Sequence, residues 1–574
     1  MRILLLVHSF NSLTQALFVA LRAAGHTVSV ELDIADSVAA EAVALFRPDL
    51  ILAPFLKRAI GAAIWRRYLC LVVHPGVAGD RGPSSLDRAI LDGEAQWGVT
   101  VLQADAEMDA GPVWGEARFP MRAASKSSLY RKEVCAAALL AVAQALERLV
   151  AGAGPLTAQP ARAPLRPLLR QPERRIDWQA DSTALVLAKL RSADGVPGVL
   201  DSLFGQPCYL SDAHAATPAS LALVGGAAGD VVARRDDAVL RRTVDGGVWI
   251  GHARRAAAAG QAGPAPFKLA LAHCFAADFR ALPELAVPTR RASAEWAALR
   301  YWEDGGAGFL SFDFHNGAMS TEQCQRLAQA VREARLRPIR VLVLLGGEDF
   351  FSNGIHLNRI EASESPADES WRNINAMNDL ALDILSATDQ LTVSALRGNA
   401  GAGGAFLALA ADLVWACEPV LLNPHYKNMG NLYGSEYWTY SLPRRVGAEA
   451  ARALMQNRLP WSAGAALAAG LVDALLPAGL AALEQRAIAL ARDPAFAARL
   501  AEKRARRARD EAHKPLQSYR DEELARMHRN FYGFDPSYHV ARFHFVHKMP
   551  HAWTPRHLAV HRNPVLKAPP TTYE

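Results

Sequence analysis

The sequence lacks any apolar run long enough to span a bilayer, and its hydrophobic start, residues 3–7, is too short for a signal peptide. We therefore predict a cytoplasmic protein with no membrane partner. Hydrophobic residues make up 51% of the chain and charged residues 21%, which is the balance of an ordinary globular protein. Because 574 residues exceed what a single core can organise, we expect several domains.

Cysteine is scarce, with six residues and no pair at CxxC spacing. This excludes a disulfide framework and a cysteine-based zinc site, so we expect six buried thiols. The basic excess is also small, at +6, and falls into short runs at residues 162–175 and 503–509 rather than a nucleic-acid-binding module. We predict no nucleic-acid partner, and a modest positive balance suits anionic small molecules.

A metal-ligand pattern is missing as well. Six histidines gather in an aromatic stretch near the C-terminus: His539, His544, His547, His551, His557 and His561. No acidic or cysteine ligand is interleaved with them, so we expect no metal site. We predict instead that this helical and aromatic extension, residues 491–574, packs between the other domains.

The first 155 residues do carry a clear pattern, in which strand-like and helix-like segments alternate. This alternation predicts a doubly wound α/β domain with a parallel sheet and crossover helices. Strands are expected at residues 2–7, 27–31, 50–53 and 69–73, and helices at residues 12–24, 36–46 and 57–67. Ligands of such sheets bind beyond the carboxyl ends of the strands. His74, which follows the fourth strand, is therefore a candidate catalytic residue.

The stretch from His74 to Pro83, together with residues 98–102 and 109–112, resembles the folate-dependent formyltransferase family. The resemblance implies that formyltetrahydrofolate is the one-carbon donor and that His74 and Asp109 flank its formyl group. In such acyl transfer an imidazole moves the proton and a nearby carboxylate fixes its tautomer. Further folate contacts are implied for Phe55, Leu56, Arg81, Gly82 and Gln103.

The sequence departs from that family at Val72, where the family has an asparagine that donates to the formyl oxygen. An apolar side chain cannot stabilise an oxyanion. The donor must therefore be His74, Gln103 or a backbone amide of residues 76–82, and the sequence leaves these three open.

The middle of the chain separates two functional halves. A stretch rich in proline, arginine and alanine, residues 152–172, reads as a domain boundary. Residues 172–255 resemble the small β-barrel appended to formyltransferases. The Ala-, Pro- and Gly-rich residues 256–293 are interpreted as a linker.

A glycine-rich run, Gly398-Asn-Ala-Gly-Ala-Gly-Gly404, joins an apolar strand to a small-residue helix. Backbone amides at such a helix start can form an oxyanion hole. With the upstream stretch from Phe350 to Leu357, it resembles the crotonase (enoyl-CoA hydratase/isomerase) family over residues 294–490. That resemblance implies a crotonase-like α/β spiral fold in which the Ile355 and Gly403 amides hold a thioester oxygen. Coenzyme A contacts are expected at Ser352, Gly354 and Gly404.

Hydratases of the crotonase family need two glutamates, but the matching positions here are Phe406 and His425. Simple hydration of an enoyl-CoA is therefore not expected. Tyr426 and Glu436 are predicted to be catalytic instead, because burial among the aromatic residues of 432–440 would raise the pKa of Glu436 toward neutrality. An ion pair between Glu436 and the arginines at 444 and 445 is the alternative.

The order of these regions resembles the HoxX-type family of hydrogenase maturation proteins over essentially the whole chain. This resemblance implies a bifunctional formyltransferase and formyl-CoA decarbonylase (a lyase) that makes carbon monoxide for a [NiFe]-hydrogenase. Its expected partners are small-molecule substrates, including coenzyme A, and hydrogenase maturation proteins. Three alternatives stay open: a formyl-CoA hydrolase or transferase that uses His425, a tRNA formyltransferase fused to an inert crotonase half, and a maturation scaffold without coenzyme A chemistry.

Overall fold

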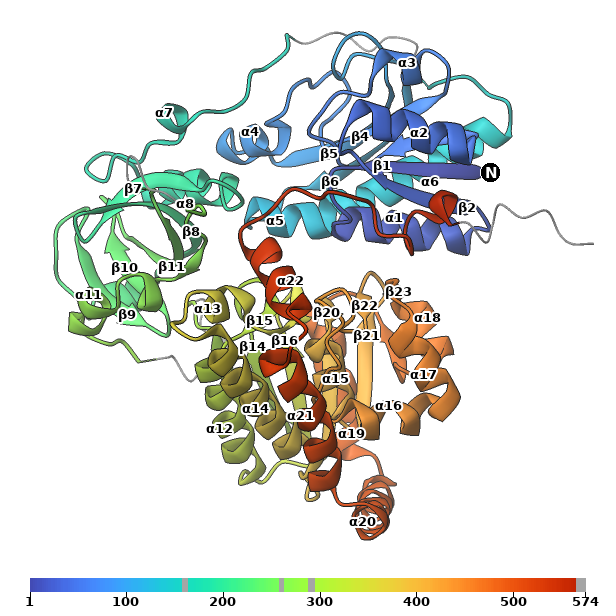
Figure 1. The fold of residues 1–574 in the computed structure, drawn as a ribbon. Helices are drawn as coiled ribbons and strands as arrows, with labels where there is room; N and C mark the ends of the chain where they lie inside the picture. Colours follow the sequence, from blue (N-terminus) through green and yellow to red (C-terminus); the bar gives the residue numbers. More distant parts are fainter. Residues whose placement is uncertain (157–163, 258–262, 287–294, 564–574) are drawn as a thin grey trace, which may run out of the picture.

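The computed structural model describes residues 1–156, 164–257, 263–286 and 295–563. These residues form three folded units and a C-terminal extension (Figure 1). The first unit is blue and lies at the top, the second is green and lies at the left, and the third lies below them. The extension, in red, leaves the third unit and returns to the first. This confirms the predicted multidomain α/β architecture. No helix in the described ranges combines the length and apolarity needed to cross a bilayer.

The first unit is built on a six-stranded sheet of order β2-β1-β3-β4-β5-β6. Strands β1 to β4 are parallel, as predicted, whereas β5 and β6 run antiparallel and were not predicted. The residues of β1 are buried from Ile3 to Val7, because helices cover both faces of the sheet. The strands are β1 (Arg2–Val7), β2 (Thr27–Leu32), β3 (Leu50–Ala53), β4 (Cys70–His74), β5 (Gln96–Gln103) and β6 (Val113–Pro120).

The helices of this unit are α1 (Ser12–Ala23), α2 (Asp36–Phe46), α3 (Ala62–Trp65), α4 (Ser85–Leu91), α5 (Lys126–Leu129), the π-helix η1 (Tyr130–Val134) and α6 (Cys135–Val150). The helix predicted at residues 57–67 is therefore too long. Only α3 is helical there, and it starts directly after Gly61, a poor helix former.

The second unit is an antiparallel sheet of order β7-β8-β11-β10-β9, with β12 on β11. Its strands are β7 (Val199–Leu203), β8 (Gln206–Ala215), β9 (Val231–Arg235), β10 (Ala238–Arg242), β11 (Gly247–Arg255) and β12 (Leu269–Ala270), and its helices are α7 (Gln171–Arg174), α8 (Thr183–Ser192), α9 (Pro218–Leu221), α10 (Leu271–Cys274) and α11 (Ala276–Ala281). Because β12 and α10 pack on β11, this unit extends into the predicted linker at residues 256–293, which is correspondingly shorter.

The third unit combines a six-stranded main sheet, a four-stranded second sheet and a two-stranded sheet in a repeating spiral. Each main-sheet strand β16, β19 and β21 is followed along the chain by a strand of the second sheet, β17, β20 or β22. The main sheet comprises β13 (Leu299–Asp304), β14 (Ala307–Phe312), β16 (Val341–Gly346), β19 (Leu391–Leu396), β21 (Leu413–Cys417) and β24 (Ala474–Leu476). The smaller sheets contain β17 (Phe350–Ser352), β20 (Asn399–Gly401), β22 (Leu421–Asn423) and β23 (Trp461–Ser462), and the pair β15 (Ala318–Met319) and β18 (Gly354–Ile355).

Helices surround this spiral and begin with the short η2 (His315–Gly317). The others are α12 (Thr321–Arg335), α13 (Leu357–Glu361), α14 (Pro366–Leu385), α15 (Gly403–Leu409), α16 (Trp438–Val446), α17 (Ala448–Gln456), α18 (Ala463–Ala468) and α19 (Leu480–Arg492). The glycine-rich run, residues 398–404, therefore contains β20 and the first residues of α15.

The C-terminal extension comprises α20 (Phe496–His513), α21 (Leu516–Tyr532), α22 (Ser537–Val546) and η3 (Val560–Arg562). Helix α21 packs on α14 and α16 of the third unit, and η3 packs on α2 and β2 of the first (Figure 1). The fully buried Glu31 of β2 accepts a hydrogen bond from Arg562 at 2.8 Å and lies 2.8 Å from Nε2 of His561. The extension thus contacts both units, as the sequence predicted.

Candidate functional site

The first candidate site lies at the carboxyl end of β4, where the strand ends in His74. This imidazole is buried, and carboxylates approach both of its nitrogens. Nε2 lies 2.9 Å from Oδ2 of Asp80, and Nδ1 lies 3.7 Å from Oδ1 of Asp109. The predicted pair is brought together, but the closer carboxylate is Asp80, which sequence reasoning missed.

Asp80 is held in its charged form. Burial opposes ionisation, but hydrogen bonds from His74, Ser85 and Arg166 outweigh it and lower the pKa of Asp80 to about 2. Arg166 lies 2.5 Å from Oδ1 of this carboxylate. Gly76 leaves the necessary room, since a Cβ there would lie 2.4 Å from His74 Nε2 and 2.5 Å from Asp80 Oδ2. An ionised carboxylate at this distance fixes the orientation of the imidazole.

The other predicted folate residues do not all reach the same point. Gly82 N donates to Oδ2 of Asp109 at 3.1 Å, and Arg81 Nε donates to the Met108 carbonyl at 3.0 Å, so these loops meet beside His74. Phe55 and Leu56 follow β3, the neighbour of β4. Gln103 instead pairs with Leu71, three residues before His74, and its Oε1 accepts from Trp114 at 3.1 Å.

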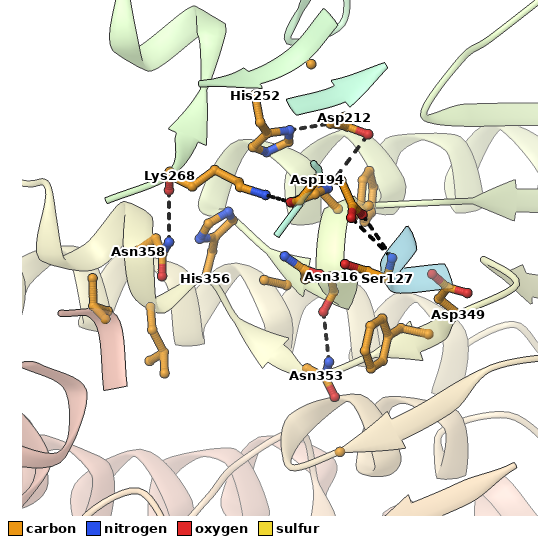
Figure 2. Close-up of a pocket in the computed structure, with 18 of the residues that line it drawn as sticks. Ser127, Asp194, Asp212, His252, Lys268, Asn316, Asp349, Asn353, His356 and Asn358 are labelled. Atoms are coloured by element: carbon orange, nitrogen blue, oxygen red, sulfur yellow. Dashed lines mark hydrogen bonds and ion pairs between the residues drawn. The ribbon is translucent and has the colours of Figure 1, made fainter. Parts of the chain in front are cut away.

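The second candidate site is a cavity of about 1210 Å³ at the junction of all the units. Figure 2 shows its wall, with Asp212 and His252 from the second unit, Ser127 from the first, and Asn353 and His356 from the third. Residues of the extension also line it, including Met527 and His547. Neither His74 nor Asp109 is among its lining residues.

Two backbone segments meet at the cavity wall as the sequence predicted. A Cβ on Gly354, whose φ is +79°, would lie 3.1 Å from Gly403 N, so β18 and the start of α15 touch. The first N–H groups of a helix have no acceptor within it and can bind an anion. Ile355 and Gly403 both line the cavity. Ser352 and Gly404 back this loop, since a Cβ on Gly404 would lie 2.0 Å from the Ser352 carbonyl oxygen.

Glu436 and Tyr426 form a hydrogen-bonded pair at the wall of this cavity. Tyr426 Oη donates to Glu436 Oε2 at 2.5 Å, and Ser435 N donates to the same oxygen at 3.2 Å. Burial raises the pKa of Glu436 to about 7 against these hydrogen bonds. A Cβ on Gly403 would lie 2.2 Å from Glu436 Oε1, so the carboxyl group lies directly against the start of α15.

The alternative interpretation of Glu436 as an ion-pair partner is wrong. Arg444 pairs with Asp510 at 2.6 Å, and Arg445 pairs with Asp473 at 3.0 Å. Within the described residues, the Glu436 carboxylate accepts from the Tyr426 hydroxyl and the Ser435 amide and pairs with no cation. Its burial is therefore compensated by hydrogen bonds alone.

Aromatic rings replace one of the two hydratase carboxylates. Phe406 stacks on Tyr426 with ring centroids 5.1 Å apart, and Trp438 lies 6.4 Å from Phe406. His425, at the other position, is buried, and burial lowers its pKa to about 4. Neither of its ring nitrogens has a hydrogen-bond partner in the described part of the chain. A water-activating carboxylate pair is thus not formed by these two positions.

A group that could hold a metal ion lies on the upper wall in Figure 2. Asp212, His252 and His315 each offer a ligand atom within 4.8 Å of the others. Asp212 Oδ2 lies 2.7 Å from His252 Nδ1, and Oδ1 lies 2.9 Å from His214 Nε2, so imidazoles already surround this carboxylate. Sequence reasoning missed the group because its members come from two units and no local spacing links them.

The predicted thiols are largely as expected: five of the six cysteines are buried, and Cys135 is half-buried. Of the tail histidines, His547 lies 3.3 Å from Glu361 and His561 lies 2.8 Å from Glu31. These contacts connect the extension to the third and first units.

The sequence matches two families: Formyl transferase over residues 1–143, and Enoyl-CoA hydratase/isomerase over residues 312–555. Methionyl-tRNA formyltransferase of Anaeromyxobacter dehalogenans is 29% identical over 228 residues, which are 38% of this chain and 71% of that protein.

Two proteins are similar over nearly the full length. Hydrogenase maturation factor HoxX of Bradyrhizobium diazoefficiens is 56% identical over 575 residues, covering 99% of this chain and 98% of that protein. The crystal structure of HypX from Aquifex aeolicus in complex with tetrahydrofolic acid is 45% identical, with a TM-score of 0.93 over 98% of this chain and 99% of that one. The shared architecture therefore includes both candidate sites and the extension.

Proposed function

Because this chain belongs to the HoxX family of hydrogenase maturation factors, we propose that it makes carbon monoxide in two steps. The first step transfers a formyl group from formyltetrahydrofolate to coenzyme A, and the second decarbonylates formyl-CoA to carbon monoxide and coenzyme A. The product supplies the carbon monoxide ligand of a [NiFe]-hydrogenase iron. The observation that carries this proposal is the contact of the buried Tyr426–Glu436 pair with the start of α15 at Gly403, where we place the oxyanion hole.

In the first step the formyl C–N bond of the folate breaks and a C–S bond to coenzyme A forms. The thiol proton moves to the folate nitrogen, and His74 is placed to relay it. Asp80 and Asp109 hold this imidazole from its two sides. Val72 cannot donate a hydrogen bond, and Gln103 is displaced along the sheet, so we assign polarisation of the formyl oxygen to His74 or to the amides of residues 76–82.

In the second step the amides of Ile355 and Gly403 hold the formyl oxygen. Glu436 accepts the formyl proton while the C–S bond breaks, carbon monoxide leaves, and the proton passes to the coenzyme A sulfur. A carboxylate with a pKa near 7 can both accept and return a proton at neutral pH. The buried Phe406 ring stacks on Tyr426 and shields that side of the pair from water, which favours decarbonylation over hydrolysis of the thioester.

We assign coenzyme A to the cavity because basic side chains that can pair with its phosphates line part of the wall. Arg131, Arg254 and Lys268 line the cavity wall from the first and second units, and guanidinium groups match phosphate geometry. Lys268 Nζ donates to the Asp194 carbonyl at 2.6 Å, which leaves its positive charge uncompensated by that contact. Its position is drawn at the left of Figure 2.

The test is a gas-capture assay with purified protein, formyltetrahydrofolate and coenzyme A, in which reduced haemoglobin traps carbon monoxide. We expect carbon monoxide from the parent protein and none from Glu436→Gln, with unchanged output from Glu449→Gln, an exposed glutamate of α17. Formate without carbon monoxide would overturn the proposal in favour of a formyl-CoA hydrolase and direct attention to His425. No binding of coenzyme A would support the scaffold instead.

A further inference from the structure

The C-terminal extension places a second buried carboxylate beside Glu436. Glu523 lies in the middle of α21 and has no solvent-exposed surface. Glu436 is also almost fully buried. A buried carboxylate without compensation is costly, so its contacts show what it serves. All its hydrogen bonds are to a single turn of the third unit, residues 435–439, which carries Glu436.

The contacts form a clamp on that turn. Glu523 Oε2 accepts from Tyr437 N at 3.0 Å and from Ser435 Oγ at 3.3 Å. Its Oε1 accepts from Thr439 N at 2.8 Å and from Thr439 Oγ1 at 2.6 Å. The Tyr437 and Thr439 amides lie at the start of α16, so Glu523 caps this helix from outside, where a negative charge is favourable.

The clamped turn is strained. Glu436 and Tyr437 have φ values of +60° and +59°, a conformation that L-residues with large side chains rarely adopt. Two in succession persist only if their surroundings hold them. Asn378 Oδ1 of α14 accepts a hydrogen bond from Glu436 N at 2.8 Å, and Glu523 Oε2 accepts one from the next amide, Tyr437 N. These two bonds aim the Glu436 side chain at Tyr426 and the oxyanion-hole loop.

We propose that Glu523 is a positioning residue of the crotonase-like site, contributed by the C-terminal extension, which fixes the Glu436 turn and tunes the proton affinity of Glu436 through a shared buried network. The network runs from Glu436 to Glu523 by way of Ser435, whose amide contacts the first carboxylate and whose hydroxyl contacts the second. This inference rests on the proposed function of Glu436. It gives α21 a role in the chemistry beyond joining two units.

The electrostatics follow from the geometry. Burial raises the pKa of Glu523 to about 7, and the nearby Glu436 charge adds to that effect. Two like charges in one dry network raise each other's pKa, so removing one lowers the pKa of the other. Other titratable or charged groups near the pair are Tyr426, Tyr433, Tyr437, Cys324, Arg520 and Arg526.

The test compares Glu523→Gln with Glu523→Asp and with Glu522→Gln. Glu522 is the adjacent, exposed residue of α21, paired with Lys514 at 2.7 Å, and serves as the matched control. Carbon monoxide formation is measured from pH 5 to 9 for each protein. Because Glu436 must be ionised to accept the formyl proton, the acidic limb of the profile reports its pKa.

Glu523→Gln removes the charge, so we expect the acidic limb to move to lower pH by about half a unit or more, with kcat reduced about tenfold. Glu523→Asp keeps the charge but shortens the clamp, so its limb should stay in place while kcat falls. Glu522→Gln should match the parent. An acidic limb that does not move in Glu523→Gln would overturn the proposal.

A second measurement is independent of catalysis. Infrared spectroscopy can titrate the carboxyl band of Glu436, identified by its loss in Glu436→Gln. A lower titration midpoint in Glu523→Gln supports the inference even if the parent forms no carbon monoxide, in which case the proposed function fails and the positioning role stands. An unchanged midpoint contradicts this inference about Glu523 and leaves the proposed function intact. If Glu523→Gln does not fold, the same titration is made in Glu523→Asp. We then expect an unchanged midpoint for Glu436 but a carboxyl band of altered intensity or position. A band identical to that of the parent would contradict the proposal that Glu523 positions the Glu436 turn.

Discussion

His74 and Asp80 lie in hydrogen-bond contact, with Nε2 and Oδ2 2.9 Å apart and both side chains buried. The five residues between them form a loop that turns the carboxylate back onto the imidazole. Arg166 completes the arrangement from the opposite side of Asp80. Asp80 engages Nε2 of this imidazole, so Nδ1, which lies 3.7 Å from Asp109, is the nitrogen beside which a substrate can bind.

Asp80→Asn should slow formyl transfer more than it disturbs folding. The change replaces a charge-assisted contact, worth about 1.5–3 kcal/mol, and predicts a loss of roughly 10- to 100-fold in the rate of tetrahydrofolate release. Asp105→Asn, which changes an exposed aspartate nearby, is the control. Equal rates in Asp80→Asn and the parent would show that Asp109 alone orients His74.

The sequence could locate His74 because the rule that places it is local: the end of a parallel strand is where ligands bind. Asp80 is only six residues away, yet no periodicity says that the loop folds back. Its position depends on Gly76, which leaves space for the pair, and on Arg166, which arrives from 86 residues downstream. Tertiary contacts of that kind have no signature in one sequence.

The third unit likewise contains site residues that the sequence could reveal and one that it could not. Glu436 could be predicted because aromatic residues surround a lone carboxylate there, and Gly403 because the glycine run and the stretch from Phe350 to Leu357 together resemble the crotonase family. Glu523 lies in a charged helix beside Asp521 and Glu522, where nothing distinguishes it from a solvated residue. Only the packing of α21 on α14 and α16 shows that one of these three acidic residues is buried.

Tyr426→Phe tests how the hydrogen bond from the Tyr426 hydroxyl affects the pKa of Glu436. The Tyr426 hydroxyl lowers the pKa of Glu436, so its removal should raise that pKa and move the acidic limb of carbon monoxide formation to higher pH. This shift is opposite in sign to the one expected for Glu523→Gln. The rate at the optimum should fall about 100-fold if the hydroxyl also assists proton transfer.

The comparison for this variant is Tyr433→Phe, which keeps the ring that packs on Trp438 at 5.4 Å. Its profile should superimpose on that of the parent. A shift of Tyr426→Phe to lower pH would mean that the hydroxyl accepts rather than donates in this contact.

Gly403→Ala should abolish decarbonylation while leaving formyl transfer intact. An added Cβ would lie 2.2 Å from Glu436 Oε1 and 2.8 Å from its Cδ, so the carboxyl group must move away from the oxyanion-hole loop. Gly464→Ala is the matched control, because a Cβ there meets only Ser462 Oγ at 4.0 Å. The measurement is the ratio of carbon monoxide released to tetrahydrofolate released. An unchanged ratio would place the reacting carbonyl elsewhere.

Glu31→Gln should release the end of the C-terminal extension from the first unit. Burial opposes the charge of Glu31, but hydrogen bonds from His561, Thr554 and Arg562 lower its pKa below the usual value. A carboxylate with a depressed pKa contributes stability above its unfolded pKa of about 4.3, and that contribution is lost as the pH falls through the folded value. At pH 7 we expect a local destabilisation of about 1–3 kcal/mol, seen as faster amide hydrogen exchange in residues 549–563.

The control for that release is Glu41→Gln, which removes the exposed partner of Arg562 in a contact of 2.7 Å. An exposed pair contributes about 0–1 kcal/mol, so exchange in the extension should barely change. The sign of the pH dependence adds a second check. The difference between Glu31→Gln and the parent should be full at pH 7 and shrink as the pH falls below about 4, because the parent then loses the same charge. A difference that grows on acidification would mean that His561, rather than Glu31, carries the charge that holds the extension in place.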